Sequence, residues 1–324
     1  MRRSAALLTA STARPRRAAL YVPASNARAL ARAPSLRADV VIIDLEDAVA
    51  PASKVAARIN ALSTLSVGAR GRFHHTELLL RVNGVGTMWH DDDMRHVTEA
   101  LASGTVELDG IVLPKVESIA QVLGAVAALQ NNSGATPAAT VALTTASAPA
   151  QVPLWAMIET ARGVIRCADI AATGCIAGLI AGTSDLSVDL RCDGAASARL
   201  ALLPSLGAIV LAARAAGIVA LDGVHLTPEA DASFDAVCAQ GVVLGFDGKT
   251  VIHPSQIKGA HTAFAPSISA VANAQRTLAA WGEAQKRGDG VAVLDGRLVE
   301  VLHAREAAAL LAQHDRIRAA EASL

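Results

Sequence analysis

The stretch PLWAMIETARG, residues 153–163, combines the two features that predict the fold. Its apolar half is typical of a buried β-strand, and the residues after it begin a helical pattern. The apolar run stops at Glu159. Burying an unpaired carboxylate costs several kcal/mol. We therefore expect this strand end to present Glu159 to a positively charged partner.

The same alternation of a short apolar run and a helical pattern recurs along the chain and is typical of βαβ units with a parallel sheet. We predict eight strands, at residues 18–23, 40–47, 78–84, 109–115, 153–160, 176–185, 217–226 and 241–249. Eight strands interleaved with helices indicate an α/β fold of the (β/α)8 TIM barrel type. A chain of 324 residues is long enough to form one.

Polar residues gather at the carboxyl-terminal ends of these apolar runs. They are Asp44, Glu46, Arg81, Asn83, Lys115, Glu159, Asp185, Asp222 and Lys249. In a TIM barrel all these ends converge on one face, and that face carries the active site. We therefore expect an enzyme whose chemistry lies at this face.

Composition narrows the class of protein. The chain is 52% hydrophobic but only 2% aromatic, which predicts a core of Ala, Val, Leu and Ile. Lys+Arg and Asp+Glu balance at 29 each without a basic stripe, so nucleic acid is not an expected partner. We expect no apolar run to approach the roughly 18 residues of a membrane span. Four cysteines without CxxC spacing indicate reduced thiols of a cytoplasmic protein.

Three regions follow from these patterns. Residues 1–15 form an Arg-rich leader that we expect to be disordered, although it superficially suits a transit peptide. Residues 16–266 form the catalytic barrel, interrupted at residues 131–151 by a Thr/Ser/Pro-rich insertion on the face away from the chemistry. Residues 267–324 form a helical C-terminal extension with a hairpin-like lid, which should pack on the barrel or on a neighbouring subunit.

Glu159 and Asp185 close the predicted fifth and sixth strands, so the two carboxylates should lie side by side. Two carboxylates at such a short distance repel each other unless a cation lies between them. One or two carboxylates with waters and substrate oxygens are what Mg²⁺ prefers. The sequence therefore predicts a Mg²⁺ site. The alternative is a salt bridge of Glu159 with Arg162 or Arg81.

Arg81 emerges from the third strand into the same face, where its guanidinium can grip a substrate carboxylate at two points. The alternative is a structural ion pair with the acidic residues of the second strand, Asp44, Glu46 and Asp47.

Lys115 is a candidate Schiff-base lysine. The favoured alternative is a lysine that supports the site through an ion pair with Glu46 or Glu117, because a metal would supply the electrophilic chemistry.

Eight ordered blocks then indicate a family. LYVPASNARALARA, VVIIDLEDAVAPASKVAAR, LLLRVNGVGT, GIVLPKVES, AMIETARGV, AGTSDLSVDL, GFDGKTVIHPSQI and LDGRLVE span residues 16–303. Together they resemble the citrate lyase β-subunit-like family of acyl-CoA lyases, which includes malyl-CoA and citramalyl-CoA lyases and malyl-CoA thioesterases.

The resemblance implies a Mg²⁺-dependent lyase that breaks or forms a carbon–carbon bond between an acyl-CoA and a 2-oxo acid such as glyoxylate or pyruvate. A malyl-CoA thioesterase is the alternative, as is a citrate lyase β subunit acting on a carrier-bound citryl thioester. A non-catalytic binding module is a further alternative, which the carboxylate pair disfavours.

The resemblance also implies roles for individual residues. Glu159 and Asp185 would bind the metal, Arg81 would bind the carboxylate of the oxo acid, and Ser184 would lie at the substrate. Tyr21 and Arg32 would hold CoA, with Asn26 standing where several relatives have arginine. Ile252 and His253 would line the acyl-CoA channel.

The block LDGRLVE departs from the family pattern at Glu300, which stands where longer relatives have aspartate. The resemblance implies that this carboxylate is the general acid/base and that it reaches over a neighbouring subunit's site in a homotrimer or hexamer. The alternative is a solvated turn residue, with Asp44 or Glu46 as the next candidates for the catalytic proton transfer.

Overall fold

The computed structural model describes residues 14–73, 76–131, 152–192 and 198–322. The chain divides into two compact units, one that holds Arg16–Ala263 and a C-terminal one that holds Phe264–Leu324. The predicted leader, apart from residues 14–15, and the insertion at 131–151, apart from residue 131, lie outside the described residues.

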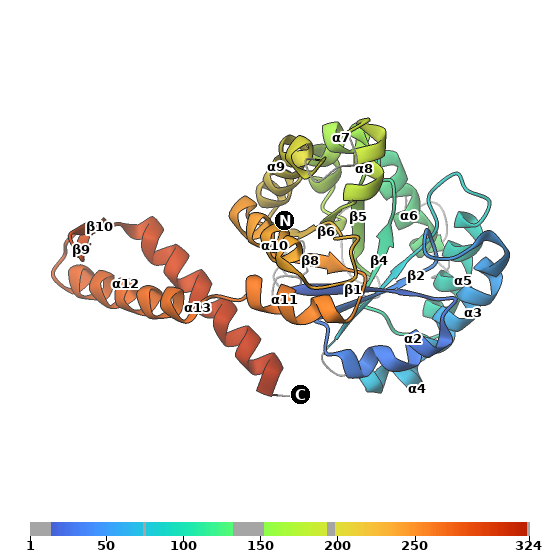
Figure 1. Ribbon diagram of the computed structural model, residues 1–324, viewed down its shortest axis with the longest axis horizontal. Coiled ribbons are helices and arrows are strands. Elements are labelled where there is room, and N and C mark those ends of the chain that lie inside the picture. Colours follow the sequence, from blue (N-terminus) through green and yellow to red (C-terminus); the bar gives the residue numbers. More distant parts are fainter. Residues whose placement is uncertain (1–13, 74–75, 132–151, 193–197, 323–324) are drawn as a thin grey trace. The chain divides into compact units, whose positions relative to one another are not determined.

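Eight parallel strands close into a barrel in the order of the sequence, and helices surround it (Figure 1). The strands are β1 (Ala18–Pro23), β2 (Val40–Asp44), β3 (Glu77–Arg81), β4 (Gly110–Leu113), β5 (Leu154–Ile158), β6 (Ile176–Ala181), β7 (Val219–Asp222) and β8 (Gly248–Val251). The barrel closes where β1 pairs with β8, with Ala19 opposite Thr250. The predicted TIM barrel is confirmed.

Helices connect the strands along the outside of the barrel. They are α2 (Ala27–Arg32), α3 (Lys54–Thr64), α4 (Val67–Arg70), α5 (His90–Ala102), α6 (Ile119–Asn131), α7 (Ala161–Ala171), α8 (Thr183–Asp189), α9 (Ala198–Ala216), α10 (Ala232–Leu244) and α11 (Ser255–Ala263), with short 3₁₀ turns at η1 (Ala33–Leu36), η2 (Pro51–Ser53) and η3 (Gly71–Phe73).

Three predicted strands miss one end by four residues or more. The seventh was expected to reach residue 226, but β7 ends at Asp222. The eighth was expected at 241–249, but residues 241–244 complete α10, and β8 begins at Gly248. The β-branched run there reads as a strand, yet it continues a helix until Gly245, whose φ of 95° ends it. The sixth was expected to reach residue 185, but β6 ends at Ala181 and Asp185 lies in the first turn of α8.

One tryptophan fills the barrel interior. Trp155 of β5 is fully buried, and glycines on both neighbouring strands make room for its ring. A Cβ added at Gly178 would lie 2.3 Å from the ring, and one at Gly110 would lie 3.0 Å from it. The remaining interior side chains are aliphatic, including Ile42, Leu79 and Ile180, as the composition predicts.

Helix α9 corrects the expectation that no apolar stretch reaches membrane-spanning length. Residues Arg199–Ala216 have a mean hydropathy of 1.5 over 18 residues, so by length and composition alone this helix is long and apolar enough to cross a membrane. The helix carries Pro204 in its interior and packs against α7, β6 and β7. The apolar face therefore belongs to the layer of helices around the barrel.

The C-terminal unit contains two long helices and a hairpin. Helices α12 (Ile268–Lys286) and α13 (Val301–Ala322) pack against each other, with β9 (Ala292–Leu294) and β10 (Arg297–Val299) between them in sequence. The strands pair antiparallel through a tight turn at Asp295 and Gly296, both with positive φ. Ala284, Ala292 and Val299 form its small core.

Candidate active site

A cavity of about 300 Å³ opens at the carboxyl-terminal ends of the strands. It is lined by residues from seven of the eight strands or the segments that follow them. The predicted site residues among them are Tyr21, Asp44, Arg81, Glu159, Ser184, Asp185 and Ile252. About half of the residues that line this cavity are thus predicted site residues.

Arg81 ends β3 and is held by acidic residues of β2 and the loop after it. Its Nε and Nη2 donate to the two oxygens of Asp44, both at 2.7 Å, and Nη1 lies 2.9 Å from Oε2 of Glu46. The guanidinium lies 4.8 Å from the centre of the Tyr21 ring. The structural ion pair that was expected as an alternative is therefore formed, and one edge of the guanidinium is already occupied.

Asp44 is fully buried and has no oxygen left for proton transfer. Besides Arg81, its carboxylate accepts hydrogen bonds from the backbone N–H groups of Glu46 and Ala48, at 2.9 and 3.2 Å. This argues against Asp44 as a substitute catalytic base. Its geometry instead fixes the orientation of Arg81.

Lys115 lies in the loop after β4. Its ammonium is 2.8 Å from Oε1 of Glu46 and 2.9 Å from Oδ2 of Asp185. Partial burial by itself would lower the pKa of Lys115. The hydrogen bonds that its ammonium donates to Asp185 and Glu46 have the larger effect, and they raise the pKa above the ordinary lysine value. A Schiff-base lysine needs a neutral amine. The supporting role, with Glu46 as partner, is the one that the geometry fits.

Glu159 follows β5 directly and is 2% exposed. Its Oε1 accepts the backbone N–H of Lys115 at 2.7 Å. Arg162 pairs instead with Glu117, at 3.6 Å. Burial, reinforced by the charge of Glu46, raises the pKa of Glu159 to about 8. Within the described residues Glu159 forms no side-chain ion pair, although the charges of Lys115 and Arg81 partly offset this rise in its pKa.

Gly182 provides the space for the Glu159 side chain. A Cβ added at Gly182 would lie 2.3 Å from Cβ of Glu159 and 2.4 Å from its Oε2. Contacts that short cannot form without moving one of the two residues. Gly182 precedes α8, whose first turn places Ser184 and Asp185 at the cavity. The two predicted metal ligands are thus positioned by one close approach between β5 and the start of α8.

The donor set fits a divalent cation. Five carboxyl groups gather here, those of Asp44, Glu46, Asp47, Glu159 and Asp185, and in the described part of the chain the ion pairs that they form come from Arg81 and Lys115. No group of three or more metal-binding side chains is found in the described ranges. A Mg²⁺ ion held by two carboxylates and by water or substrate oxygens needs no such group.

Four predicted site residues are not among those that line this cavity: Glu46, Arg32, His253 and Glu300. Arg32 ends α2 with an exposed side chain, and His253 is exposed and hydrogen-bonded through Nδ1 to Ser255 at 2.9 Å. Glu300 belongs to the C-terminal unit, where its N–H donates to Nδ1 of His303 at 3.0 Å, at the start of α13. Tyr21, expected at CoA, lines the cavity beneath Arg81.

Two polar residues that were predicted to lie at strand ends turn away from the cavity. Asp222 and Lys249 are fully buried, 3.3 Å apart, and Asp222 also pairs with Arg199 of α9 at 2.8 Å. Because side chains alternate along a strand and Leu221 points into the barrel, Asp222 points out toward the helices. This pair anchors α9 and does not join the site.

Lys54 was missed by the sequence reading. It is buried at the start of α3, and its ammonium donates to the backbone carbonyls of Leu45 and Glu46, at 2.7 and 2.8 Å, and to Oδ1 of Asn83 at 2.6 Å. It thereby fixes the loop that carries Glu46. Lys54 lies ten residues after Asp44, the end of β2. Its role could not be predicted from this position, because the chain must first fold back to bring Lys54 to the loop.

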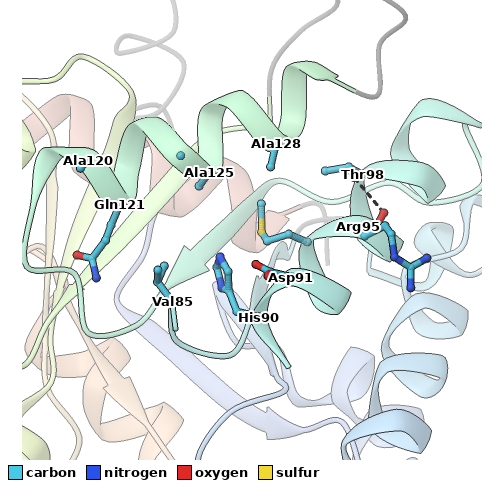
Figure 2. A pocket seen from close by; sticks show the side chains of 11 residues that line it. Val85, His90, Asp91, Arg95, Thr98, Ala120, Gln121, Ala125 and Ala128 are labelled. Carbon is cyan, nitrogen blue, oxygen red and sulfur yellow. Dashed lines mark hydrogen bonds between the residues drawn. The ribbon is translucent and has the colours of Figure 1, made fainter. Parts of the chain in front are cut away.

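A second cavity, of about 590 Å³, lies between α5 and α6 (Figure 2). Small residues of α6, such as Ala125 and Ala128, form one side of it. His90 lies on the other side, with its Nδ1 bonded to the carbonyl of Asn83 at 2.7 Å. None of its lining residues, all within the described ranges, is a predicted site residue.

Comparison with known proteins places this site in a family. A family model described as HpcH/HpaI aldolase/citrate lyase matches residues 17–254, most of the chain. The chain belongs to the HpcH/HpaI aldolase/citrate lyase family. The resemblance inferred from the eight sequence blocks is thereby confirmed.

Members of this family differ in how similar they are to the chain. It is 41% identical to a (3S)-malyl-CoA thioesterase of Cereibacter sphaeroides, over 97% of this chain and 100% of that protein. It is 30% identical to an L-malyl-CoA/beta-methylmalyl-CoA lyase of the same species, over 95% and 97% of the two chains.

A solved family structure has a similar fold. CitE of Mycobacterium tuberculosis, in complex with magnesium, acetoacetate and coenzyme A, has a TM-score of 0.71 and 31% identity, over 94% of this chain and 99% of that one. Family members are enzymes, both lyases and a thioesterase.

The raised pKa of Glu159 predicts the pH dependence of stability in the metal-free protein. Between about pH 4.5 and 8 the folded state keeps a proton on Glu159 that the unfolded chain releases, so stability should fall as the pH rises through this window. Above about pH 8 that contribution is lost. Glu159→Gln, which cannot ionise, should flatten the slope.

Thermal unfolding of both proteins in EDTA at pH 5, 6, 7 and 8 measures this effect. Each unit of pH contributes up to about 1.4 kcal/mol from one proton, so the two proteins should diverge most between pH 5 and 8. Parallel midpoints for the two proteins over the whole range would show that Glu159 ionises normally.

Proposed function

We propose that this protein hydrolyses the thioester of malyl-CoA or of a closely similar 3-carboxy-hydroxyacyl-CoA. The observation that carries the proposal is the 41% identity, over the full length of both chains, to a (3S)-malyl-CoA thioesterase. The lyases of the family resemble the chain less, at 30%. Carbon–carbon cleavage was the first expectation from the sequence, and the comparisons support its alternative better.

The carboxylate cluster supports a Mg²⁺ ion on Glu159 and Asp185. Both line the cavity, and Glu159 is a buried carboxylate that forms no side-chain ion pair within the described residues. A family structure that contains magnesium supports the same assignment. When bound, the ion supplies a Lewis acid that polarises a substrate oxygen. The proposed Mg²⁺ also answers why the apolar strand β5 ends in Glu159.

Arg81 is proposed to bind the free carboxylate of the substrate. Asp44 takes its Nε and Nη2, and Glu46 lies 2.9 Å from its Nη1, so the substrate carboxylate would meet the Nη edge by displacing Glu46. Asp44 and the Tyr21 ring hold the guanidinium in one orientation, which lowers the entropy lost when a carboxylate binds. Ser184 and Ile252 would then flank the acyl group.

Proton transfer is proposed to come from Glu300 of a partner subunit in a homotrimer. A retained carboxylate at this position supports the proposal, because glutamate and aspartate have similar unperturbed pKa values. In hydrolysis the base would take a proton from water as its oxygen joins the acyl carbon, and the sulfur of CoA would leave as the thiol. Arg32 and His253, both exposed, are proposed to contact CoA outside the cavity.

The products decide between hydrolysis and cleavage. Hydrolysis of malyl-CoA consumes one water and yields malate and a free CoA thiol, whereas cleavage yields glyoxylate and acetyl-CoA with no free thiol. Purified protein with Mg²⁺ and malyl-CoA is expected to release thiol and malate in equal amounts, without glyoxylate. Stoichiometric glyoxylate without thiol would instead establish the lyase.

A further inference from the structure

Lys115 contacts both proposed metal ligands, each through a different group. Its backbone N–H donates to Oε1 of Glu159 at 2.7 Å, and its ammonium lies 2.9 Å from Oδ2 of Asp185. No other residue in the described ranges is recorded with a hydrogen bond or ion pair to both carboxylates. A single residue therefore links the two halves of the metal site.

The ammonium of Lys115 is surrounded by carboxylates in the manner of a bound cation. Glu46 lies 2.8 Å away, Asp185 2.9 Å and Asp47 3.6 Å. Its side chain remains 41% exposed, so it can move outward without leaving a void. A metal ion bound to Asp185 would compete with the ammonium for the same oxygen, because two cations at such a short distance repel each other.

The backbone of Lys115 is held in a conformation that few residues adopt. Its φ is 50°, in the left-handed region that is unfavourable for residues other than glycine. Such strain persists only where surrounding contacts enforce it, and it concentrates at functional sites. Here the conformation turns the N–H toward Glu159 and the side chain toward Asp185 at the same time.

We propose that Lys115 is the internal counter-cation of the metal site, which holds Asp185 in the metal-free protein and releases it when a divalent cation binds. Lys115 is thus a positioning residue with two effects. It keeps the carboxylates together without metal, and it weakens metal binding by competition. The inference rests on the proposed Mg²⁺ site at Glu159 and Asp185.

The two effects predict opposite changes in one variant. Lys115→Met removes the ammonium but keeps the backbone N–H and most of the side-chain volume. This substitution should lower the thermal midpoint of the protein in EDTA, and it should lower the dissociation constant of Mg²⁺ by about tenfold. Saturating Mg²⁺ should then raise the midpoint of the variant more than that of the native protein.

Two further variants separate competition from other causes. Lys115→Arg keeps a cation and should bind Mg²⁺ close to the native affinity. Lys258→Met removes an exposed lysine of α11, so it makes the same change in net charge without touching the site. The Mg²⁺ affinity of each variant and of the native protein can be measured by calorimetric titration without substrate, alongside the thermal midpoints.

The outcomes distinguish this inference from the proposed function. If Lys115→Met binds Mg²⁺ no more tightly than the native protein, Lys115 does not compete with the metal, although the metal site stands. If neither protein binds Mg²⁺, both the metal site and the role of Lys115 are overturned. Tighter binding by Lys115→Met but not by Lys258→Met or Lys115→Arg supports the counter-cation.

Discussion

Glu159→Gln is expected to lower kcat/KM for thioester hydrolysis by roughly a thousandfold or more. The glutamine keeps the shape of the side chain and can still accept the N–H of Lys115, which the structure places at 2.7 Å. It cannot supply the negative charge that the proposed Mg²⁺ needs. Asp185→Asn should cause a similar loss, and EDTA should abolish turnover of the native protein.

Gly182→Ala tests the same site without altering any charge. The added methyl would overlap Cβ and Oε2 of Glu159, so the carboxylate must shift away from its position. A displacement of about one ångström is enough to reduce activity by around a hundredfold. Glu99→Gln, a neutralisation on the exposed side of α5, is the control and should have native activity.

Two results would contradict the metal site. Native turnover by metal-free protein in EDTA is one, and full activity of both Glu159→Gln and Asp185→Asn is the other. Loss of activity in Glu159→Gln together with loss of folding would be uninformative by itself, so the thermal midpoint of each variant is measured in parallel. We expect Glu159→Gln to be as stable as the native protein at pH 8 or more so, because the buried charge is gone.

The second large effect concerns Glu300 and the proposed oligomer. If Glu300 serves the site of a partner subunit, Glu300→Ala and Glu159→Ala should each be nearly inactive alone. Mixed and allowed to exchange subunits, they should regain part of the native activity. Some of the mixed sites would then combine an intact Glu159 with an intact Glu300 from another chain.

Matched mixtures make the complementation interpretable. Glu159→Ala mixed with Asp185→Ala should stay inactive, because both changes damage the same site of each chain. Glu306→Ala, a change of another glutamate on α13, should leave activity unaffected. Full activity of Glu300→Ala alone would show that Glu300 moves no proton. The absence of any gain on mixing, with inactive parents, would place Glu300 and Glu159 in the same subunit's site.

The periodicity of the sequence was sufficient for the barrel. Each apolar run followed by a helical pattern became a strand and its helix, since a strand buried on both faces needs a continuous apolar run. Three strands were wrong at one end by four residues or more, and one of these ends lies where a local pattern fits both a strand and a helix. At residues 241–244 a β-branched run belongs to a helix, which only the packing of α10 and the turn at Gly245 reveal.

The site was predictable to the extent that it follows from strand order. Parallel strands in a closed barrel bring their carboxyl ends together, so Arg81, Glu159 and Asp185 had to meet once the strands were counted. The same argument failed for Asp222, which does end β7, and for Lys249, which was expected at a strand end but is the second residue of β8. Their side chains point outward and form a buried ion pair, because a strand end alone does not specify which face a residue occupies.

The sequence by itself determined which charges gather at the mouth of the barrel, because covalent order fixes which residues end the strands. Only the tertiary structure decided how those charges pair. Arg81 is taken by Asp44, Lys115 joins Glu46 to Asp185, and Glu159 accepts the backbone N–H of Lys115 beside Gly182. Pairing depends on distances of a few ångströms between side chains far apart in the chain, and no local pattern encodes them.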